Sequence, residues 1–527
     1  MPDLTRISTG KAEFDTFYPR IEAFLKQDTM DLVIDGETVH GYRSPDCPAI
    51  WLRDHSDIMR GCRYFETDLV STVQHFADTQ AANGRVFDFV TNQSLIPTAA
   101  KENWVQYVRV PVEADVEYRF VKAAFLAWQS TGDNGFIENL MPSLERALEY
   151  VFTHPWRWDS ERQLVKRAYT IDSWDFAYTA GMHDWLQFQI DDNTFWGIMH
   201  GDNSGYYEAC CLMAHMCNRI GKDARAQHWT RFAEGLRDRL NATCWNGRFY
   251  THFVKTTPVD IPGLDEENQL SFSNAMDINR GVTSHTQAVS ILNEYLGRKK
   301  ENQSFAEWYS IDPAFPNGAF GDEKLVPGAY VNGGILPLVG GELARAYLEN
   351  GFEEQGVATL RQYYGMIEEN NETFLWYFPD GRASSVETST SPDAMPTDGW
   401  GSSAMLYGFM EGLAGIQDHG CCLDVVRLCP RWAAAGVDSA EVETGYAASG
   451  AHFGYQYEQG SDSLKLEIHS RHSLVDIHLL LPTGSEVASV STRSGDLEFA
   501  ESTVGQSRYL DCQMAIMDGA EITVRLK

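Results

Sequence analysis

Two short segments, about two hundred residues apart, hold the side chains best suited to acid–base chemistry. The first, residues 171–176, reads IDSWDF. The second extends from 385 to 401 and contains Glu387. A carboxylic acid beside an aromatic ring is desolvated, so its pKa rises and it can donate a proton near neutral pH. A second carboxylate that removes a proton from water would complete the groups needed to cleave a bond between sugars.

The acidic residues of these segments also have simpler interpretations. Asp172 and Asp175 flank Trp174, and either aspartate could instead cap the helix that follows. Glu387 stands in a polar loop, where a single glutamate is usually just exposed to solvent. That loop leads into a predicted helix that begins at Trp400, and in a closed barrel of helices a loop that enters the last helix reaches the opening, where a general base would stand.

A third candidate is the run Trp51-Leu52-Arg53-Asp54, which stands directly before a predicted helix. Trp51 could provide a flat platform for the apolar face of a sugar ring, and Asp54 could accept hydrogen bonds from sugar hydroxyl groups. The alternative is structural, because Asp54 could cap the helix and form an ion pair with Arg53.

Two polar turns with glycine and asparagine lie at the starts of other predicted helices. The turn at 328–334 contains Asn332, and the turn at 200–203 contains Asp202. The 328–334 turn lacks the spacing of a phosphate-binding loop and does not follow a strand of a βαβ unit. We interpret both turns as close backbone packing at the opening of a helical barrel, and we include Asp202 and Asn332 among the candidate substrate-binding residues.

Most of the chain has apolar residues at the spacing of amphipathic helices, which Gly-, Pro- and Asp-rich loops separate into consecutive pairs. Such helical hairpins build either an open solenoid or a closed toroid. A solenoid would repeat its sequence at a fixed period, and this chain does not. We therefore predict a closed (α/α)₆ barrel. Its helices are expected near 13–27, 54–82, 112–131, 135–153, 204–221, 223–242, 283–297, 339–350, 352–369 and 400–416.

The sequence changes character after about residue 425. Polar and apolar residues alternate with period two in stretches such as 464–469 and 522–526, which predicts short strands. We therefore predict a mainly α protein with two domains. The first is an (α/α)₆ catalytic barrel at 1–425, and the second is a small antiparallel β domain, resembling a sandwich, at 426–527.

The composition limits the classes of partner. The 527 residues have a net charge of −32, which argues against binding to nucleic acid or to anionic membranes. No apolar run approaches the length of a membrane span, and no signal peptide is visible. The ten cysteines lack the paired spacings of a zinc site, and no motif calls for a metal or an organic cofactor. We expect a cytoplasmic protein that acts on a small, mostly neutral molecule.

In chain order, these motifs resemble those of the inverting glycoside hydrolases with an (α/α)₆ barrel, in particular the trehalases and the processing α-glucosidase I family. The Ser-Trp-Asp-Phe segment at 173–176 is similar to the Gly-Trp-Asp-Phe segment that carries the trehalase acid, which implies this role for Asp175. In those families the base is a glutamate upstream of a Gly-Trp that opens the last barrel helix, which implies Glu387. The Trp-Leu-Arg-Asp run resembles the sugar-binding segment of exo-α-1,6-mannosidases, which implies that Arg53 and Asp54 bind the terminal sugar.

Three departures from the family patterns concern the substrate more than the reaction. Ser173 stands in place of the first glycine of the trehalase segment. Thr388-Ser389 follows Glu387, where trehalases have a Glu-Lys-Tyr run. Ile335-Leu336 precedes a proline, where related enzymes often have a tryptophan. Trehalase activity itself is therefore not expected.

The resemblance implies hydrolysis with inversion, in which Asp175 protonates the departing oxygen and Glu387 activates water. A barrel closed by loops favours removal of a terminal sugar from a short glycoside, and the resemblance implies an α linkage. The residues expected around that sugar are Trp51, Arg53, Asp54, Asp172, Trp174, Asp202, Asn332 and Trp400. The alternatives are a lyase or sugar epimerase on the same toroid, with His55, His200 or Tyr330 as its base, and a glycan-binding protein without catalysis.

Overall fold

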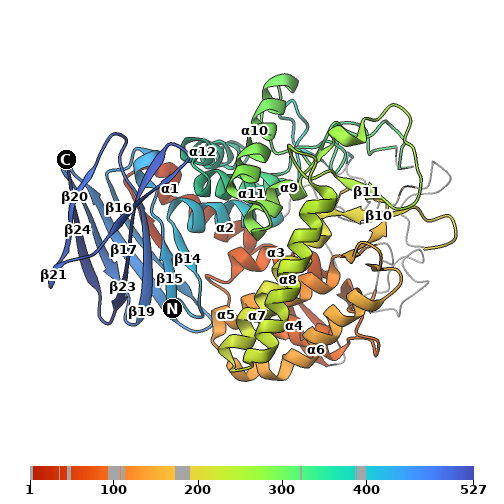
Figure 1. Cartoon of the computed structure of the whole chain (residues 1–527), viewed down its shortest axis with the longest axis horizontal. Helices are drawn as coiled ribbons and strands as arrows, with labels where there is room; N and C mark the ends of the chain where they lie inside the picture. The colour runs from red at the N-terminus through yellow and green to blue at the C-terminus, as the bar shows by residue number, and fades with distance from the viewer. Residues whose placement is uncertain are drawn as a thin grey trace.

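A helical domain and a β domain lie side by side in the computed structural model of the chain (Figure 1). Helices predominate up to Leu413, and strands follow from Ile416 onwards. The predicted combination of a mainly α fold and a C-terminal antiparallel β domain is confirmed. The structure describes residues 4–34, 36–43, 49–92, 107–108, 113–172, 178, 190–320, 323–385, 387–388 and 399–527.

The helical domain is built around a closed inner ring, in which each helix packs against the next and the last packs against the first. The ring consists of α3 (Leu52–Cys62), α5 (Val116–Thr131), α7 (His200–Arg219), α9 (Ser273–Arg280), α11 (Pro337–Glu349) and α13 (Gly399–Tyr407). Other helices alternate with these along the chain and cover the outside of the ring. They are α2 (Phe17–Leu25), α4 (Ser71–Asp78), α6 (Asn134–Thr153), α8 (Asp223–Cys244), α10 (His285–Asn302) and α12 (Glu353–Asn370). This is the predicted (α/α)₆ arrangement.

Local sequence explains where several helices begin and how closely they pack. Ser284 and Gln287 form a capping box at the start of α10. Asp133 accepts a hydrogen bond from the Phe136 amide at the start of α6, at 3.0 Å. A Cβ atom at Gly341 of α11 would come within 2.2 Å of the backbone of α13, so glycine permits the close approach of these two helices.

Two predicted helices are each divided in the structure, and one observed helix was not predicted. The helix expected at 13–27 is α1 (Ala12–Asp15) and α2. The single helix expected at 54–82 is two helices, α3 and α4. Asp68 ends the intervening loop by accepting hydrogen bonds from the amides of Val70 and Ser71, at 3.0 and 2.9 Å. Helix α9 had not been predicted, because its eight residues, SNAMDINR, are too few and too polar to show an apolar periodicity.

The β domain consists of two facing sheets with antiparallel neighbours, except for the parallel pair β15 and β19. One sheet has the order β1 (Arg6–Ser8), β16 (Ser439–Tyr446), β17 (Ala451–Gln459), β18 (Ser463–His469), β24 (Ala520–Leu526), β20 (Val487–Thr492) and β21 (Gly495–Asp496). The other has the order β14 (Ile416–Asp418), β15 (Val425–Leu428), β19 (Ser473–Leu480), β23 (Ser507–Ile516) and β22 (Ala500–Val504). The boundary proposed at 425/426 falls at the start of β15, and the N-terminal strand β1 pairs with β16.

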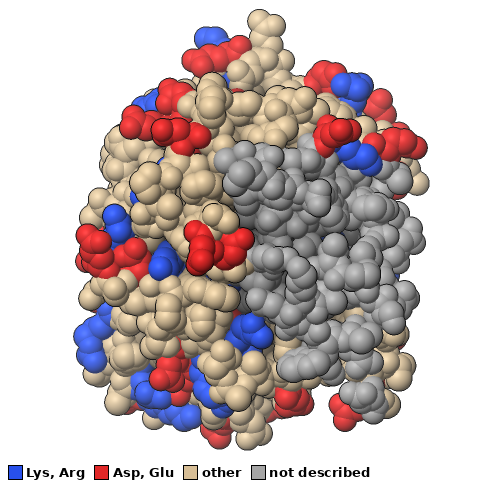
Figure 2. Space-filling model, turned by 90° about the vertical axis from the view of Figure 1, so that its right-hand side faces the viewer, with Lys and Arg blue, Asp and Glu red and all other residues tan. Residues whose placement is uncertain are grey.

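The inner ring has a fixed orientation relative to the β domain. Its C-terminal ends face that domain, as shown by an ion pair of 2.9 Å between Glu349, the last residue of α11, and the buried Arg431. The N-terminal ends therefore open on the opposite side. Figure 2 shows that side, where acidic and basic residues are interspersed over the described surface. Within the described ranges, no helix is both long enough and apolar enough to cross a membrane.

Candidate functional site

The first part of the site lies where β4 (Ala49–Trp51) leads into α3. The half-buried ring of Trp51 stacks on Phe89 of β5 (Phe89–Thr91), with 4.1 Å between ring centroids. The guanidinium group of Arg43 lies over Trp51 and also forms an ion pair with Asp54, which is buried. Trp51 and Asp54 therefore lie close together, with Arg43 in contact with both.

Arg53 is buried and points to α5 rather than to Asp54. Its Nε and Nη2 atoms donate to the two carboxylate oxygens of Asp115 at 2.6 and 2.8 Å, and Nη2 lies 2.8 Å from Oε2 of Glu113. Burial alone would raise the pKa of Asp115, but Arg53 outweighs burial and holds this pKa well below its ordinary value. Arg53 thus holds the carboxyl groups of Asp115 and Glu113 in place at the start of α5.

Asp172 and Asp202 lie at the starts of α9 and α7. Asp172 is fully buried and accepts hydrogen bonds from the backbone amide and the hydroxyl of Ser273, at 3.2 and 3.0 Å, so it caps the distant helix α9 and not a helix directly after it in the chain. Asp202 is also buried, and Arg167 approaches its two carboxylate oxygens at 3.3 and 3.4 Å. Both aspartates are held at the N-terminal opening of the ring.

The pKa of Asp202 is raised from its ordinary value of 3.8 to about 6. Burial is the largest cause, Arg167 opposes it, and the negative charges of Asp115 and Asp172 add to it. A carboxyl group with this pKa exchanges its proton near neutral pH. Strongly perturbed acids of this kind are concentrated at functional sites. Asp202 is therefore the described acid at this opening that is best suited to hold or move a proton.

Trp400 is connected to the same cluster through the ring axis. It is the second residue of α13, and its indole Nε1 donates to Oδ2 of Asp57 at 2.8 Å. The other oxygen of Asp57 accepts from Arg119 at 2.6 Å, and Nε of Arg119 lies 3.6 Å from Asp115. A continuous chain of polar contacts thus leads from Trp400 to the acids of α5.

Asn332 and Glu387 lie in two other segments of the chain. The amide group of Asn332 is buried and bonds to the backbone of Phe315 and Leu325 at 2.7–3.1 Å, which fastens the loop before α11. Glu387 is exposed, and a hydrogen bond from the Ser385 hydroxyl lowers its pKa. Trp174 and Asp175 lie outside the described residues.

Sequence reasoning missed several charged residues of this cluster. Glu113 and Asp115 stand in the first turn of the helix predicted at 112–131, as Asp54 begins the helix predicted at 54–82, and this shared position could have identified them. Asp57 and Arg119 lie one turn inside their helices, facing the axis. Arg167 lies in the two-residue strand β9 (Arg167–Ala168), and nothing in the local sequence predicts that it belongs to this cluster. Over the residues that the structure describes, no group of acidic, histidine and cysteine side chains is arranged to hold a metal ion.

Comparison with known proteins identifies the fold. No family model and no curated protein matches the chain. Its structure is similar to that of α-L-rhamnosidase from Dictyoglumus thermophilum, with a TM-score of 0.61 and 11% identity over 99% of this chain and 50% of that chain. The α-L-rhamnosidase of Streptomyces avermitilis complexed with L-rhamnose gives a TM-score of 0.60 and 11% identity, over 99% of this chain and 42% of that one.

A shorter relative in structure is the GH63 mannosylglycerate hydrolase from Thermus thermophilus. It gives a TM-score of 0.53 and 15% identity over 75% of this chain and 99% of that chain. The present chain spans half or less of the length of the two rhamnosidases. At such low identities, the similarity shows that the protein shares the six-hairpin fold of these glycoside hydrolases.

Proposed function

We propose that the protein is a glycoside hydrolase that removes a terminal sugar from a short, mostly neutral, α-linked glycoside with inversion of configuration. The observation that carries this proposal is the cluster of buried acids at the N-terminal opening of an (α/α)₆ ring, with Asp202 at a pKa of about 6. The fold shared with two rhamnosidases and a mannosylglycerate hydrolase supports the same conclusion.

In the proposed mechanism, Asp175 donates a proton to the departing glycosidic oxygen, and Glu387 takes one from the attacking water. In inverting enzymes the two carboxyl groups stand roughly 6.5–9.5 Å apart, which leaves space for that water. Trp51, Asp54, Trp174 and Trp400 would contact the terminal sugar. The resemblance to trehalases and to the α-glucosidase I family supports this assignment of roles, which calls for no cofactor or metal.

Arg53 and Asp202 have roles that follow from their contacts. Because the guanidinium of Arg53 is already bonded to Asp115 and Glu113, we assign it the positioning of these two acids. Asp202 would hold a proton beside the reacting sugar and hydrogen-bond to its hydroxyl groups. Asp172, whose oxygens are occupied by Ser273, would act by anchoring the start of α9 close to Asp202.

A lyase or an epimerase on this fold has less support. Such enzymes need a histidine or tyrosine base that is free to approach the substrate. His55 is buried and stacked on Tyr42, and burial lowers its pKa to about 3. His200 is enclosed between Asp277 and Ser271, at 2.5 and 2.8 Å. Both imidazoles are committed to the core of the helical domain.

The test is a screen of aryl glycosides and disaccharides, followed by proton NMR of the first anomer released from each active substrate. We expect release of a terminal sugar, first detected as the anomer opposite to that of the substrate. Retention of configuration would overturn the inverting mechanism. An unsaturated product that absorbs in the ultraviolet would favour a lyase, and binding without release would favour a glycan-binding protein.

A further inference from the structure

The chain contains two pairs of adjacent cysteines in very different settings. Cys210 and Cys211 lie within α7, where neighbouring side chains point about 100° apart and do not face each other. Cys421 and Cys422 lie in the turn between β14 and β15. All four thiols are free. The two pairs therefore have the same chemistry but differ in geometry.

The sulfur atoms of the 421–422 pair both contact the C-terminal end of α5. Sγ of Cys421 lies 3.5 Å from the carbonyl oxygen of Trp128 and 3.7 Å from that of Gln129. Sγ of Cys422 lies 3.8 Å from the carbonyl oxygen of Ser130. Because both sulfur atoms lie against the carbonyl oxygens of three consecutive residues, the turn holds them side by side.

The backbone of this turn is fixed by its neighbours. Asp418 accepts hydrogen bonds from the amides of Gly420 and Leu423, at 2.9 and 3.0 Å. The Cys422 amide donates to the Gln129 carbonyl at 2.8 Å. These bonds hold Cys422 and Leu423 at φ values of 53° and 62°, a left-handed conformation that residues with a Cβ rarely adopt. The pair is thus held in one arrangement rather than sampled by a loose loop.

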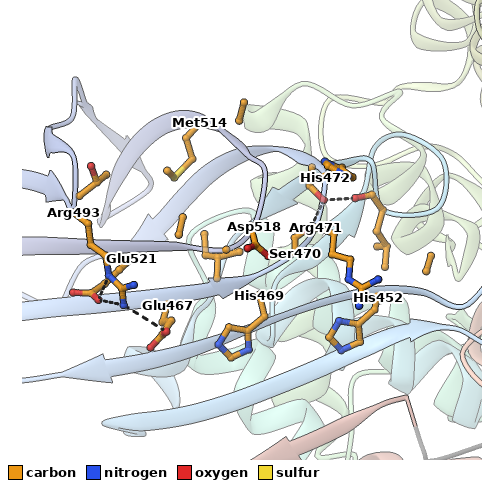
Figure 3. A pocket seen from close by; sticks show the side chains of 18 of the residues that line it. His452, Glu467, His469, Ser470, Arg471, His472, Arg493, Met514, Asp518 and Glu521 are labelled. Atoms are coloured by element: carbon orange, nitrogen blue, oxygen red, sulfur yellow. Dashed lines mark hydrogen bonds and ion pairs between the residues drawn. The ribbon is translucent and has the colours of Figure 1, made fainter.

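Cys422 also lines a cavity of about 1090 Å³ at the end of the β sandwich. Figure 3 shows this cavity, whose lining residues include Arg471, His452, His472, Glu467 and Asp518. A cavity of this size accommodates a small peptide. Its mixture of cationic and acidic groups fits a ligand that carries both carboxylates and an ammonium group.

The protonation of the pair favours attack by Cys422. Cys422 lines the cavity, and a hydrogen bond from the Cys421 thiol and another from Ser449 lower its pKa against the effect of burial. The same interaction raises the pKa of Cys421. Since the thiolate is the nucleophile in disulfide exchange, Cys422 would react first and Cys421 second.

We propose that Cys421 and Cys422 form a reactive dithiol that small zwitterionic disulfides, such as oxidised glutathione, reach through this cavity and convert reversibly to an internal disulfide. The Cys422 thiolate attacks one sulfur of the small disulfide and expels a thiolate. Cys421 then loses its proton, attacks Sγ of Cys422 and expels the second thiolate. The two cysteines are oxidised, the small disulfide is reduced to two thiols, and the protons pass to the thiolates released.

The internal disulfide should be easily reduced again. Adjacent Cα atoms lie about 3.8 Å apart, whereas disulfides usually join Cα atoms about 4.4–6.8 Å apart. A bridge between neighbours is therefore strained, and strained disulfides have more oxidising potentials. This property is typical of a regulatory thiol pair and not of a structural cross-link.

The experiment treats the folded full-length protein with oxidised glutathione, alkylates the remaining thiols after unfolding, and examines the peptides by mass spectrometry. We expect the peptide that contains 421–422 to lose two hydrogen atoms and to regain them with dithiothreitol. The peptide that contains Cys210-Cys211 is the internal control and should carry two alkyl groups. Cys421→Ser should retain glutathione on Cys422, because the second thiol is gone, and Cys422→Ser should not form an adduct.

Three results would overturn the proposal. One is wild-type protein with glutathione on Cys422 and no internal disulfide. Another is equal oxidation of both cysteine pairs, because the turn would then make Cys421 and Cys422 no more reactive than two adjacent cysteines in a helix. The third result concerns the route to the thiols. We expect Arg471→Ala to slow oxidation by oxidised glutathione severalfold and to leave oxidation by the neutral hydroxyethyl disulfide unchanged. Equal rates for wild type and Arg471→Ala with both reagents would exclude the cavity as the route.

Discussion

The inner ring carries buried acids at two depths, its N-terminal opening and the axis beneath, and their surroundings differ. In the axis, Asp57 is bonded to Arg119 and lies close to Arg60, and Glu342 is paired with Arg60 at 2.6 Å. Burial would raise the pKa of both acids, but these arginines lower it instead. At the opening, Asp202 is equally buried, yet its pKa is raised to about 6.

The difference lies in the balance of neighbouring charges, not in the degree of burial, because Arg167 and Arg157 near Asp202 are opposed by two other acids. Asp202 has Arg167 beside it at 3.3 Å, and it also faces the negative charges of Asp115 and Asp172. A unit charge at 4 Å is worth about 4 kcal/mol at an effective dielectric constant near 20, so one arginine more or less decides whether an acid ionises. The axis therefore stabilises the ring, whereas the opening keeps an acid that can exchange protons.

The strongest test of this division uses the proposed catalytic pair. Asp175→Asn and Glu387→Gln should each lower turnover at least about a hundredfold, because each removes a general acid or base. Neither should change the free energy of unfolding measured in urea. Glu372→Gln, at an exposed loop glutamate upstream of Glu387, is the matched control and should leave turnover unchanged. Near-normal turnover in either catalytic variant would contradict the role of that residue.

Substitutions in the axis should instead lower the stability of the protein. Arg60→Met leaves Glu342 buried without its partner, so we expect the free energy of unfolding to fall by about 3–5 kcal/mol in urea denaturation. Adding Glu342→Leu should recover part of this loss, because no charge then remains buried alone. Arg382→Met breaks an exposed pair with Asp380 and should have no measurable effect. If Arg60→Met leaves stability intact, the axis does not have the role assigned here.

The two depths should also differ in pH dependence. Between about pH 4 and 6 the folded protein keeps the Asp202 proton that the unfolded chain has lost, so this group costs stability as the pH rises. Asp202→Asn should therefore gain about 3 kcal/mol relative to wild type between pH 4 and pH 7. Glu342 has a lowered pKa and contributes stability above its unfolded pKa, which is lost as the pH falls. Glu342→Gln should thus become more stable relative to wild type as the pH falls. If the stability difference from wild type changed with pH in the same direction for both variants, the two depths would not differ as proposed.

The fold was predictable because the apolar periodicity of its long helices is strong and continuous. Helices such as α6 and α8 bury one face against the ring, and that face is readable in the sequence. Helix α9 was not predicted, because it is short and its residues that line the axis are polar. The β domain was predictable from strands like β18, where Leu464, Leu466 and Ile468 are buried and their neighbours are exposed.

The site was predictable only in part, because its charges are set by contacts between distant segments. The position of Asp54 beside an aromatic residue could be read locally. That Arg53 would turn to Asp115, 62 residues away, could not, and neither could the approach of Arg167 to Asp202. The pKa of Asp202 depends on charges from three different segments, so no motif around residue 202 contains it.

Trp400 connects the opening with the axis, and its substitution should have the smallest effect on stability. Its indole donates to Asp57 from the opening side, and Trp400→Phe removes that donor while keeping an aromatic ring. A hydrogen bond to a charged group is worth about 1.5–3 kcal/mol, and Arg119 still holds Asp57, so we expect a loss of about 1.5 kcal/mol in urea denaturation. Turnover should fall by less than in Asp175→Asn. If Trp400→Phe instead costs as much stability as Arg60→Met, the opening and the axis form one cooperative network and the division between them fails.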